Sequence, residues 1–290
     1  MKIAIFADIH GNLPALKAVL EDIKKENISK ILVLGDILGG PFPIEVIRIL
    51  RDLDAIMIRG NYEGYLLKIY SNPSNSHWYK SKQWSPTLWV YKRLNQYWLK
   101  FINSLPKQRI IPVDEKNDIL MVHSIYDPML PADDSGCLMT DKYDDVLPSY
   151  IRNIDQSVLL FAHNHVPYKK SFDGTLALSP GSIGIPLNGT IGAQYAIMHC
   201  ENEIMRAEIR TVKYPIKDIQ EGFLESGYLK EGGPIARLTL NCIKTGKAQM
   251  GLFFKFVKEI AFQKGYDEYE VIPDEILDLA EKKWDWDIFE

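Results

Sequence analysis

The sequence has few cysteines, little net charge and no long apolar run, and each shortage excludes a class of protein. Its three cysteines, Cys137, Cys200 and Cys242, are too few and too widely spaced for a disulfide framework or a cysteine zinc site. The net charge of −4 provides no basic surface for long nucleic acid. No apolar run approaches the roughly 20 residues that cross a bilayer, and no signal segment precedes the first apolar run. We therefore expect a cytoplasmic protein with neither a membrane nor a long nucleic acid as partner.

Five short polar clusters carry most of the functional information, and each follows a short apolar run. The clusters are Asp8-Ile9-His10, Gly35-Asp36, Gly60-Asn61, His123-Ser124 and His163-Asn164-His165. Apolar runs of this length, rich in β-branched residues, are typical of buried strands. Loops beyond the carboxyl ends of strands converge in an open α/β sheet, so polar residues far apart in the sequence can face one point.

The residue types in the clusters favour a site for two divalent metal ions. Carboxylates, imidazoles and a carboxamide oxygen suit Mn, Fe, Co, Ni or Zn, whereas oxygen ligands alone would suit Mg or Ca. Two such ions about 3.5–4 Å apart can act together on one phosphate group. A bridging carboxylate would hold the ions together, and Asp36, which follows a strand and a glycine, is the candidate.

The order and context of the clusters resemble the calcineurin-like metallophosphoesterase superfamily, in its small prokaryotic branch of phosphodiesterases and dinucleoside polyphosphate hydrolases. The resemblance extends from about Met1 to Val212. It implies a first metal site of Asp8, His10, Asp36 and His165, and a second of Asp36, Asn61, His123 and His163. It also implies that Ser179–Gly184 forms a tight glycine turn whose backbone passes close under the site, and the alternative is an ordinary loop between strands.

One departure from the family restricts the chemistry. Many members carry a histidine after the Gly-Asn pair that is thought to protonate the leaving group or orient the attack, and this chain has Tyr62 there. A phenol with a reference pKa of about 10 is a poor proton donor and carries no positive charge. We therefore expect a diester or an anhydride with a good leaving group to be preferred over an alkyl monoester. The expected catalytic residues are Asp36, Asn61, Tyr62 and His123.

A second departure concerns the segment after Gly35-Asp36. It lacks the Asp-Arg-Gly that eukaryotic-type Ser/Thr protein phosphatases carry there, and that arginine would hold phosphate with two hydrogen bonds. Its absence counts against a protein phosphatase. Arg59 could contact phosphate from another side or serve as a structural ion-pair partner. Besides Arg59 and Tyr62, His77 is a candidate for contacting substrate, or an ordinary surface histidine.

The pattern of the sequence predicts an α/β protein. Leu13 to Ile23, capped by Asn12, and Pro43 to Leu53 have helical spacing, so strands and helices alternate up to Asn61. After the histidine pair, hairpin segments predict a second sheet packed on the first; they are Leu176–Leu178, Tyr195–His199 and Ile204–Val212. The resemblance implies a four-layer α/β/β/α sandwich of two mixed sheets.

The sequence divides into a catalytic domain, residues 1–212, and a helical C-terminal extension, residues 213–290. The catalytic domain contains an aromatic-rich insertion, residues 63–107. In it, Pro86 to Ile102 has helical spacing, and we interpret its stripe of Tyr91, Leu94, Trp98 and Phe101 as packing. Trp78, Tyr79 and Trp84 fit a helix face less well, and they could belong to the core or stack on a nucleobase.

Two amphipathic stripes in the C-terminal extension need a partner. They are Met250, Phe253, Phe254, Val257, Ile260 and Ala261, and Ile276, Leu277, Ala280 and Trp284. They could pack over the sandwich as a lid, or form an interface in a homo-oligomer.

The sequence thus predicts a hydrolase that uses two divalent metal ions to cleave a phosphodiester or phosphoanhydride bond in a small molecule. A nucleotide, with dinucleoside polyphosphates as the leading example, is the expected substrate. The alternatives are a phosphomonoesterase, including a protein phosphatase, and a non-catalytic scaffold that keeps the fold as a protein-binding module. Retention of all seven expected ligands favours the enzyme.

Overall fold

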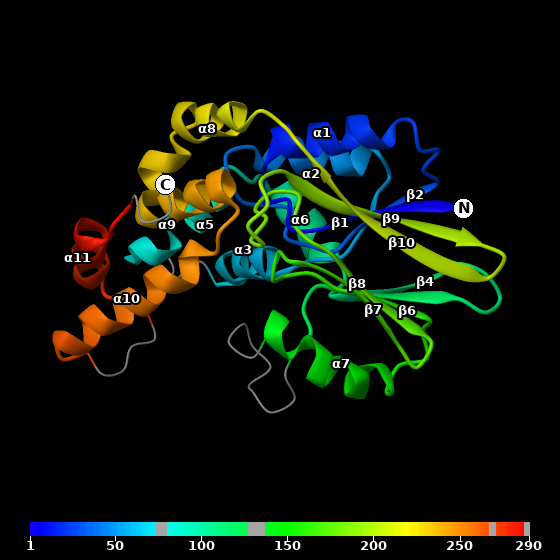
Figure 1. Ribbon diagram of the computed structural model, residues 1–290. Helices are drawn as coiled ribbons and strands as arrows, with labels where there is room; N and C mark the ends of the chain where they lie inside the picture. Colours follow the sequence, from blue (N-terminus) through cyan, green and yellow to red (C-terminus); the bar gives the residue numbers. More distant parts are fainter. Residues whose placement is uncertain (73–79, 127–136, 267–270, 287–290) are drawn as a thin grey trace.

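The computed structural model describes residues 1–72, 80–126, 137–266 and 271–286, and within them two five-stranded sheets pack face to face between layers of helices (Figure 1). The strand order is β10-β9-β1-β2-β3 in the first sheet and β4-β5-β6-β8-β7 in the second. Both sheets contain parallel and antiparallel pairs. The predicted α/β sandwich of two mixed sheets is confirmed.

The first sheet combines N-terminal strands with the last hairpin of the sandwich. β1 (Lys2–Phe6), β2 (Lys30–Val33) and β3 (Ile56–Met57) run parallel to one another, and β9 (Ala193–Glu201) runs antiparallel to β1. β10 (Ile204–Val212) forms the outer edge. The prediction that this hairpin belongs to the second sheet was wrong. β9 is buried on both faces over most of its length, which suits an interior strand, and the sequence pattern does not specify its partner.

The second sheet begins earlier than predicted. It starts with the hairpin of β4 (Gln108–Pro112) and β5 (Asp118–Val122), followed by β6 (Val158–Leu160) and by the hairpin of β7 (Pro167–Phe172) and β8 (Thr175–Pro180). The sequence analysis missed β4 and β7. Both lie at sheet edges and are largely exposed, so they lack the apolar run that marks a buried strand.

Three hydrophobic cores separate the four layers. The core between the sheets contains Ile3, Ile5 and Leu32 from the first sheet and Met121 and Leu160 from the second. α1 (Leu13–Ile23) and α2 (Pro43–Asp52) cover the outer face of the first sheet. α7 (Tyr143–Ile151), which follows the short helix η3 (Thr140–Lys142), covers the second. As predicted, Asn12 caps α1, since its side-chain oxygen accepts a hydrogen bond from the Ala15 N–H at 3.1 Å.

The aromatic-rich insertion forms several short helices. They are α3 (Asn61–Ser71), η1 (Lys82–Trp84), α5 (Ser85–Tyr91) and α6 (Gln96–Ser104). The single helix predicted over Pro86–Ile102 was wrong, because Asn95 starts a new helix by accepting a hydrogen bond from the Trp98 N–H at 3.1 Å. The interpretation of the stripe as packing is confirmed, since Leu94 and Trp98 are buried in the core.

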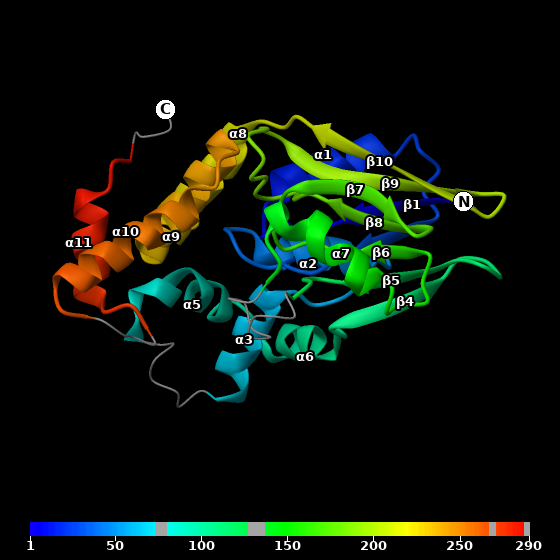
Figure 2. The same cartoon turned by 60° about the horizontal axis from the view of Figure 1, so that its bottom comes forward.

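The C-terminal helices form a layer of their own beside the sandwich (Figure 2). They are α8 (Ile216–Glu225), α9 (Tyr228–Thr245), α10 (Gln249–Gln263) and α11 (Asp274–Lys283). The two amphipathic stripes cover each other: Phe253 packs on Trp284 with ring centroids 5.3 Å apart, and both join a small core with Leu238. Each stripe thus finds its cover within this layer. Every helix in the described ranges is too short or too polar to span a membrane.

Candidate metal centre

All seven predicted metal ligands lie in loops or helix starts that follow strands. Asp8 and His10 follow β1, and Asp36 follows β2. The remaining four come after β3, β5 and β6; they are Asn61, His123, His163 and His165. Loops of both sheets thus meet at one edge of the sandwich, as the strand-end argument predicted.

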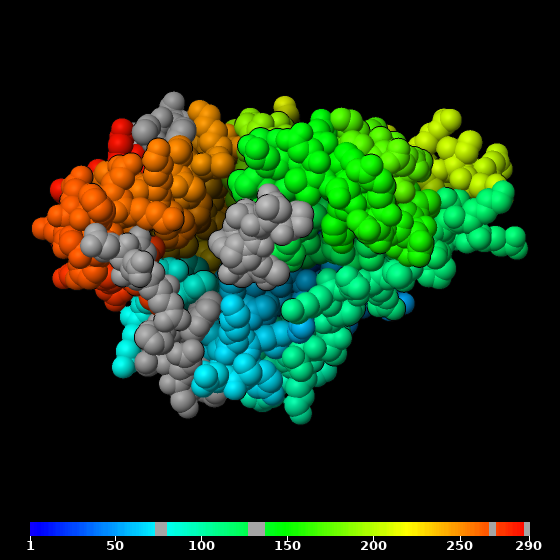
Figure 3. All heavy atoms as spheres, turned by 90° about the horizontal axis from the view of Figure 1, so that it is seen from below, coloured from blue at the N-terminus to red at the C-terminus, as the bar shows by residue number. Residues whose placement is uncertain are grey.

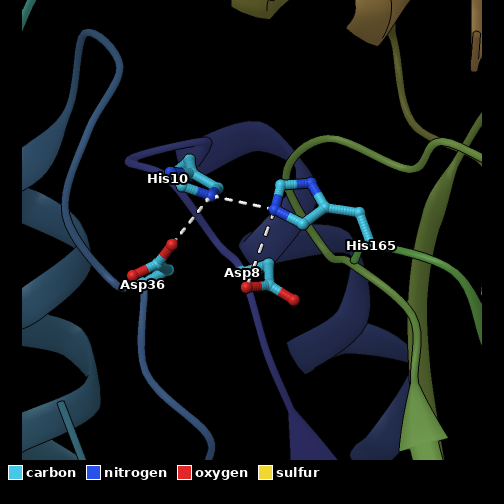
Figure 4. Close-up of side chains that lie close together, drawn as sticks. All are labelled: Asp8, His10, Asp36 and His165. Atoms are coloured by element: carbon cyan, nitrogen blue, oxygen red, sulfur yellow. Dashed lines mark hydrogen bonds and ion pairs between the residues drawn. The ribbon is translucent and has the colours of Figure 1, made fainter. Parts of the chain in front are cut away.

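The first donor set contains Asp8, His10, Asp36 and His165, and one donor atom from each lies within 4.8 Å of the others (Figure 4). The two Nε2 atoms of His10 and His165 are 3.3 Å apart. His10 Nε2 is 3.5 Å from Asp36 Oδ2, and His165 Nε2 is 3.7 Å from Asp8 Oδ1. Four donor atoms therefore face a common point.

The second donor set contains Asp36, Asn61, His123 and His163. Asn61 Oδ1 lies 2.8 Å from His123 Nε2 and 2.9 Å from His163 Nδ1. His123 Nε2 is also 3.6 Å from Asp36 Oδ2, the same oxygen that faces His10. One carboxylate oxygen thus belongs to both sets.

Five of these seven residues have a left-handed backbone conformation. The φ angles are 50° at Asp8, 45° at His10, 49° at Asp36, 78° at His163 and 57° at His165. Positive φ is uncommon outside glycine and costs about 1–3 kcal/mol where the surroundings impose it. The loops therefore hold a backbone that is unfavourable in isolation and that turns these side chains toward the centre.

The protonation states of the histidines fit a cation. His165 Nδ1 donates to the Ile185 carbonyl at 2.7 Å, so its Nε2 carries a lone pair. A backbone hydrogen bond at Leu38 likewise engages His10. Burial lowers the pKa of His165 to about 3, and burial followed by the neighbouring histidines lowers the pKa of His10 well below its usual value. The two neutral Nε2 atoms lie 3.3 Å apart and both act as acceptors. A cation that binds both of them would fit this arrangement.

The buried carboxylate of Asp8 also favours a cation at this site. Its Oδ1 is buried and has no hydrogen-bond partner within the described part of the chain. Burial, followed by the Asp36 carboxylate, raises the pKa of Asp8 well above its usual range. A buried carboxylate oxygen without a donor is costly unless a cation compensates it. The donor set therefore fits a divalent ion that binds nitrogen and oxygen ligands.

Glu63 is a residue of this site that the sequence analysis missed. Its fully buried carboxylate accepts four backbone N–H bonds of 2.9–3.0 Å, from Asp36, Ile37, Leu38 and Gly60. It thereby ties the loop of Asp36 to the start of α3. Burial and then the Asp36 carboxylate raise the pKa of Glu63 to about 7, while the backbone donors oppose that shift. The available signal was a glutamate at the third position of a helix, the usual position for a carboxylate that caps backbone N–H groups.

Close backbone approaches fix the remaining loops. A Cβ atom at Gly60 would lie 2.1 Å from Asp36 Oδ1, and one at Gly184 would lie 2.0 Å from the Ile9 carbonyl oxygen. Ser182 Oγ donates to the Asp8 carbonyl at 2.7 Å, and the Gly184 N–H donates to the same oxygen at 3.0 Å. The turn Ser179–Gly184 thus passes close under the site, as the sequence analysis expected.

Tyr62 lies against the first donor set, with its hydroxyl buried. Its ring meets the His10 ring edge to face at a centroid distance of 5.8 Å. Its N–H donates to Asp36 Oδ1 at 2.8 Å. Burial, followed by Tyr228 of α9, raises the pKa of the Tyr62 hydroxyl well above its usual value. The phenol is therefore an even weaker acid than the sequence suggested.

Arg59 and His77 are the two other residues that were predicted to contact substrate, and the structure describes only Arg59. Arg59 lines a cavity whose wall also includes Asn61 and His123. His77 lies outside the described residues, as do Trp78 and Tyr79. Trp84 packs on Tyr65 with ring centroids 5.1 Å apart.

Two mixed sheets with converging Asp, Asn and His side chains at their strand ends define a metal-dependent phosphoesterase. The chain belongs to the calcineurin-like phosphoesterase superfamily, whose domain model matches residues 1–203.

Two relatives and one solved structure illustrate the similarity. The chain is 29% identical over 242 residues to an uncharacterized protein of Methanocaldococcus jannaschii, covering 77% of this chain and 92% of that one. It is 23% identical over 217 residues to phosphodiesterase YfcE of Escherichia coli, covering 71% and 90%. A metallophosphoesterase structure from Sphaerobacter thermophilus superposes with a TM-score of 0.65 at 25% identity, covering 85% and 100%. The family relationship establishes a hydrolase of phosphate esters.

Proposed function

We propose that the chain binds two divalent metal ions, one in each donor set, and hydrolyses a phosphodiester or phosphoanhydride bond of a nucleotide. The observation that carries the proposal is the position of Asp36 Oδ2, 3.5 Å from His10 Nε2 and 3.6 Å from His123 Nε2. A single oxygen facing ligands of both sets is the arrangement that a bridging carboxylate requires. Mn, Fe, Co, Ni and Zn suit such mixed nitrogen and oxygen donors.

The protein side chains have distinct roles in this proposal. Bound divalent ions supply charge stabilisation and lower the pKa of water. Asn61 and His123 hold the second site and line the cavity that admits substrate. His123 Nδ1 donates to the Leu34 carbonyl at 2.7 Å, which fixes the ring with Nε2 turned toward the site. Glu63 positions the loops of Asp36 and Asn61 through its four backbone contacts.

Two observations support a diester or an anhydride as substrate. The phenol at position 62 is a poor acid, and its hydroxyl is buried beside Tyr228. A substrate whose leaving group needs little protonation fits such a site. The relative YfcE is named a phosphodiesterase. Dinucleoside polyphosphates, whose anhydride bonds have good leaving groups, are the leading candidates.

A turnover screen tests the substrate class. We expect metal-dependent hydrolysis of bis(p-nitrophenyl) phosphate or diadenosine tetraphosphate, with kcat/KM at least about tenfold above that for an alkyl monoester, since general acid catalysis is typically worth about 10²–10⁴-fold. The screen compares Mn, Fe, Co, Ni and Zn and measures the metal content of the purified chain. A preference for phosphoserine peptides or alkyl monoesters would overturn the proposed substrate class. Partner binding without turnover would favour a scaffold.

The variant Tyr62→His tests the absence of a general acid. An imidazole with a reference pKa near 6.5 at this position should raise monoester hydrolysis relative to diester hydrolysis by about tenfold, a fraction of the full 10²–10⁴-fold effect because the neighbours are not adapted to it. Tyr62→Phe is the matched control, since it keeps a ring on His10 without adding an acid. The measurement is a pair of pH–rate profiles. Equal losses on both substrates with no new acidic limb would mean that Tyr62 has only a packing role.

We also propose that residues 1–212, with the insertion 63–107, form the catalytic unit and that residues 213–290 cap it. The contact between Tyr62 and Tyr228 supports this proposal, because it connects α9 to a residue that packs on the metal centre.

A further inference from the structure

A cavity of about 740 Å³ lies beside the second donor set and reaches beyond it. Asn61 and His123 form part of its wall. The rest comes from α3 and the two residues before it, the end of α6, the start of β4 and Lys107 before it, the end of β5 and the loop after it, and α7. Figure 2 shows α3 and α6 side by side and α7 in front of the second sheet, and Figure 3 shows the molecule from below as spheres, with α3 in light blue and α7 in green. We call this space the lateral cavity.

Among the described residues, the lysines and arginine that line the lateral cavity give its wall a basic character. Arg59, Lys68 and Lys107 line it, and no carboxylate does so among the described residues. This is an unusual balance in a chain with 38 acidic and 34 basic side chains. Lys68 Nζ lies 5.8 Å from the centroid of the Tyr65 ring, a cation–π contact on the cavity wall. The cavity therefore favours an anionic ligand.

The remaining lining residues suit a phosphorylated nucleoside. Ser71, Asn103, Gln108 and Ser124 supply hydrogen-bonding groups, and Tyr65, Tyr126 and Tyr150 supply aromatic surfaces. Pockets for small molecules have volumes of about 300–1,000 Å³, so the lateral cavity has room for more than one phosphate group. Lysine and arginine bind phosphate through charge-assisted hydrogen bonds.

We propose that the lateral cavity binds a second phosphate group of the substrate, outside the bond that is cleaved. This inference rests on the proposed function, because it places the scissile phosphate at the two donor sets and the additional phosphate beside Arg59, Lys68 and Lys107. Two kinds of substrate have this chemistry. One is a polyphosphate chain between nucleosides, and the other is a phosphodiester with a separate terminal phosphate.

The double variant Lys68→Gln/Lys107→Gln tests the charge. We compare diadenosine tetraphosphate, a 5′-phosphorylated dinucleotide and bis(p-nitrophenyl) phosphate, which has no second phosphate. The double variant should raise KM for the substrate whose second phosphate binds in the lateral cavity. The ratio of this KM to the KM for bis(p-nitrophenyl) phosphate should increase on the order of tenfold, because charge-assisted hydrogen bonds are lost. Whichever of the first two substrates shows this shift identifies the source of the phosphate. Lys100→Gln, an exposed lysine of α6 outside the cavity, is the control.

The variant Gly64→Leu tests the space without changing the charge. Gly64 lines the cavity, and a Cβ atom there would have no neighbour within 4 Å. A leucine should therefore occupy the cavity and raise KM for the same substrate on the order of tenfold, since it displaces a group held by charge-assisted hydrogen bonds. Gly251→Leu is the matched control, because Gly251 is also helical and has no neighbour within 4 Å of a Cβ atom, and it lies outside the cavity.

Calorimetric binding of tripolyphosphate to the metal-free chain gives a result that does not depend on turnover. We expect binding to the wild type and to Gly251→Leu, and on the order of tenfold weaker binding to both cavity variants. Unchanged KM ratios together with unchanged tripolyphosphate binding would overturn the role of the lateral cavity. If the wild type hydrolyses none of the substrates with any metal but its tripolyphosphate binding follows this pattern, the proposed function fails while the anion site stands.

Discussion

Replacing Asp36 with asparagine should reduce kcat/KM by about 10³-fold or more and lower the metal content from two ions to about one per chain. The amide keeps the shape of the side chain but removes the negative charge that faces both His10 and His123. Loss of several kcal/mol of metal-supplied charge stabilisation corresponds to about this factor, since 1.36 kcal/mol is tenfold. Steady-state kinetics and elemental analysis of the purified variant are the measurements.

The control for this prediction is Asp54→Asn. Asp54 is exposed and has a φ of 51°, close to the 49° of Asp36, so both substitutions place asparagine in the same backbone conformation. Asparagine accepts left-handed φ well, and the fold should persist in both variants. If Asp36→Asn retains near wild-type turnover when metal is limiting, Asp36 does not bridge the ions.

Replacing Glu63 with alanine should lower the free energy of unfolding of the metal-free chain by about 3–5 kcal/mol, because four buried N–H groups lose their acceptor. These groups include the N–H of Asp36 and that of Gly60. The loops of Asp36 and Asn61 should also separate, so metal affinity should fall. Urea unfolding and metal titration measure the two effects.

Glu45→Ala is the matched control for Glu63. Glu45 is also a glutamate at the third position of its helix, α2, but it is exposed. Surface substitutions usually change stability by no more than about 0.5 kcal/mol. The free energy of unfolding of Glu63→Ala could instead lie within about 1 kcal/mol of the wild-type value, which is about the contribution of a single hydrogen bond. In that case the Glu63 carboxylate is not needed to hold the two loops.

The convergence of the seven candidate metal ligands could be predicted because each one is marked by local sequence. A polar residue directly after a buried apolar run is visible without knowledge of the partner strands, as with Asp8 after β1 and Asp36 after β2. Glu63 could not be found in this way. Its only local signal is its place at the third position of α3, because its partners are backbone N–H groups, which every residue type except proline supplies.

Errors in the fold arose where distant segments decide the outcome. The pairing of β9 with β1 joins Ile3 to Met198, and an apolar run alone does not determine which sheet it enters. The stripe of α10 needed cover, and its partner in α11 was equally visible in the sequence, but the apolar spacing alone does not specify that the two stripes face each other. The break between α5 and α6 had a local signal in Asn95, and helical periodicity on both sides of it concealed that signal.

The pairing of β1 with β9 also affects when the metal centre can form during protein synthesis. Ile3 and Met198 are 195 positions apart (198 − 3), so at about 5–20 residues per second β9 emerges about 10–40 s after β1. For that interval the edge of β1 that β9 will occupy has no native partner, and such edges invite pairing with other chains. Ser182 and Gly184, which hold the Asp8 carbonyl, also emerge late. The candidate metal centre is therefore completed only at the end of folding, after an interval in which the unpaired edge of β1 is open to pairing with other chains.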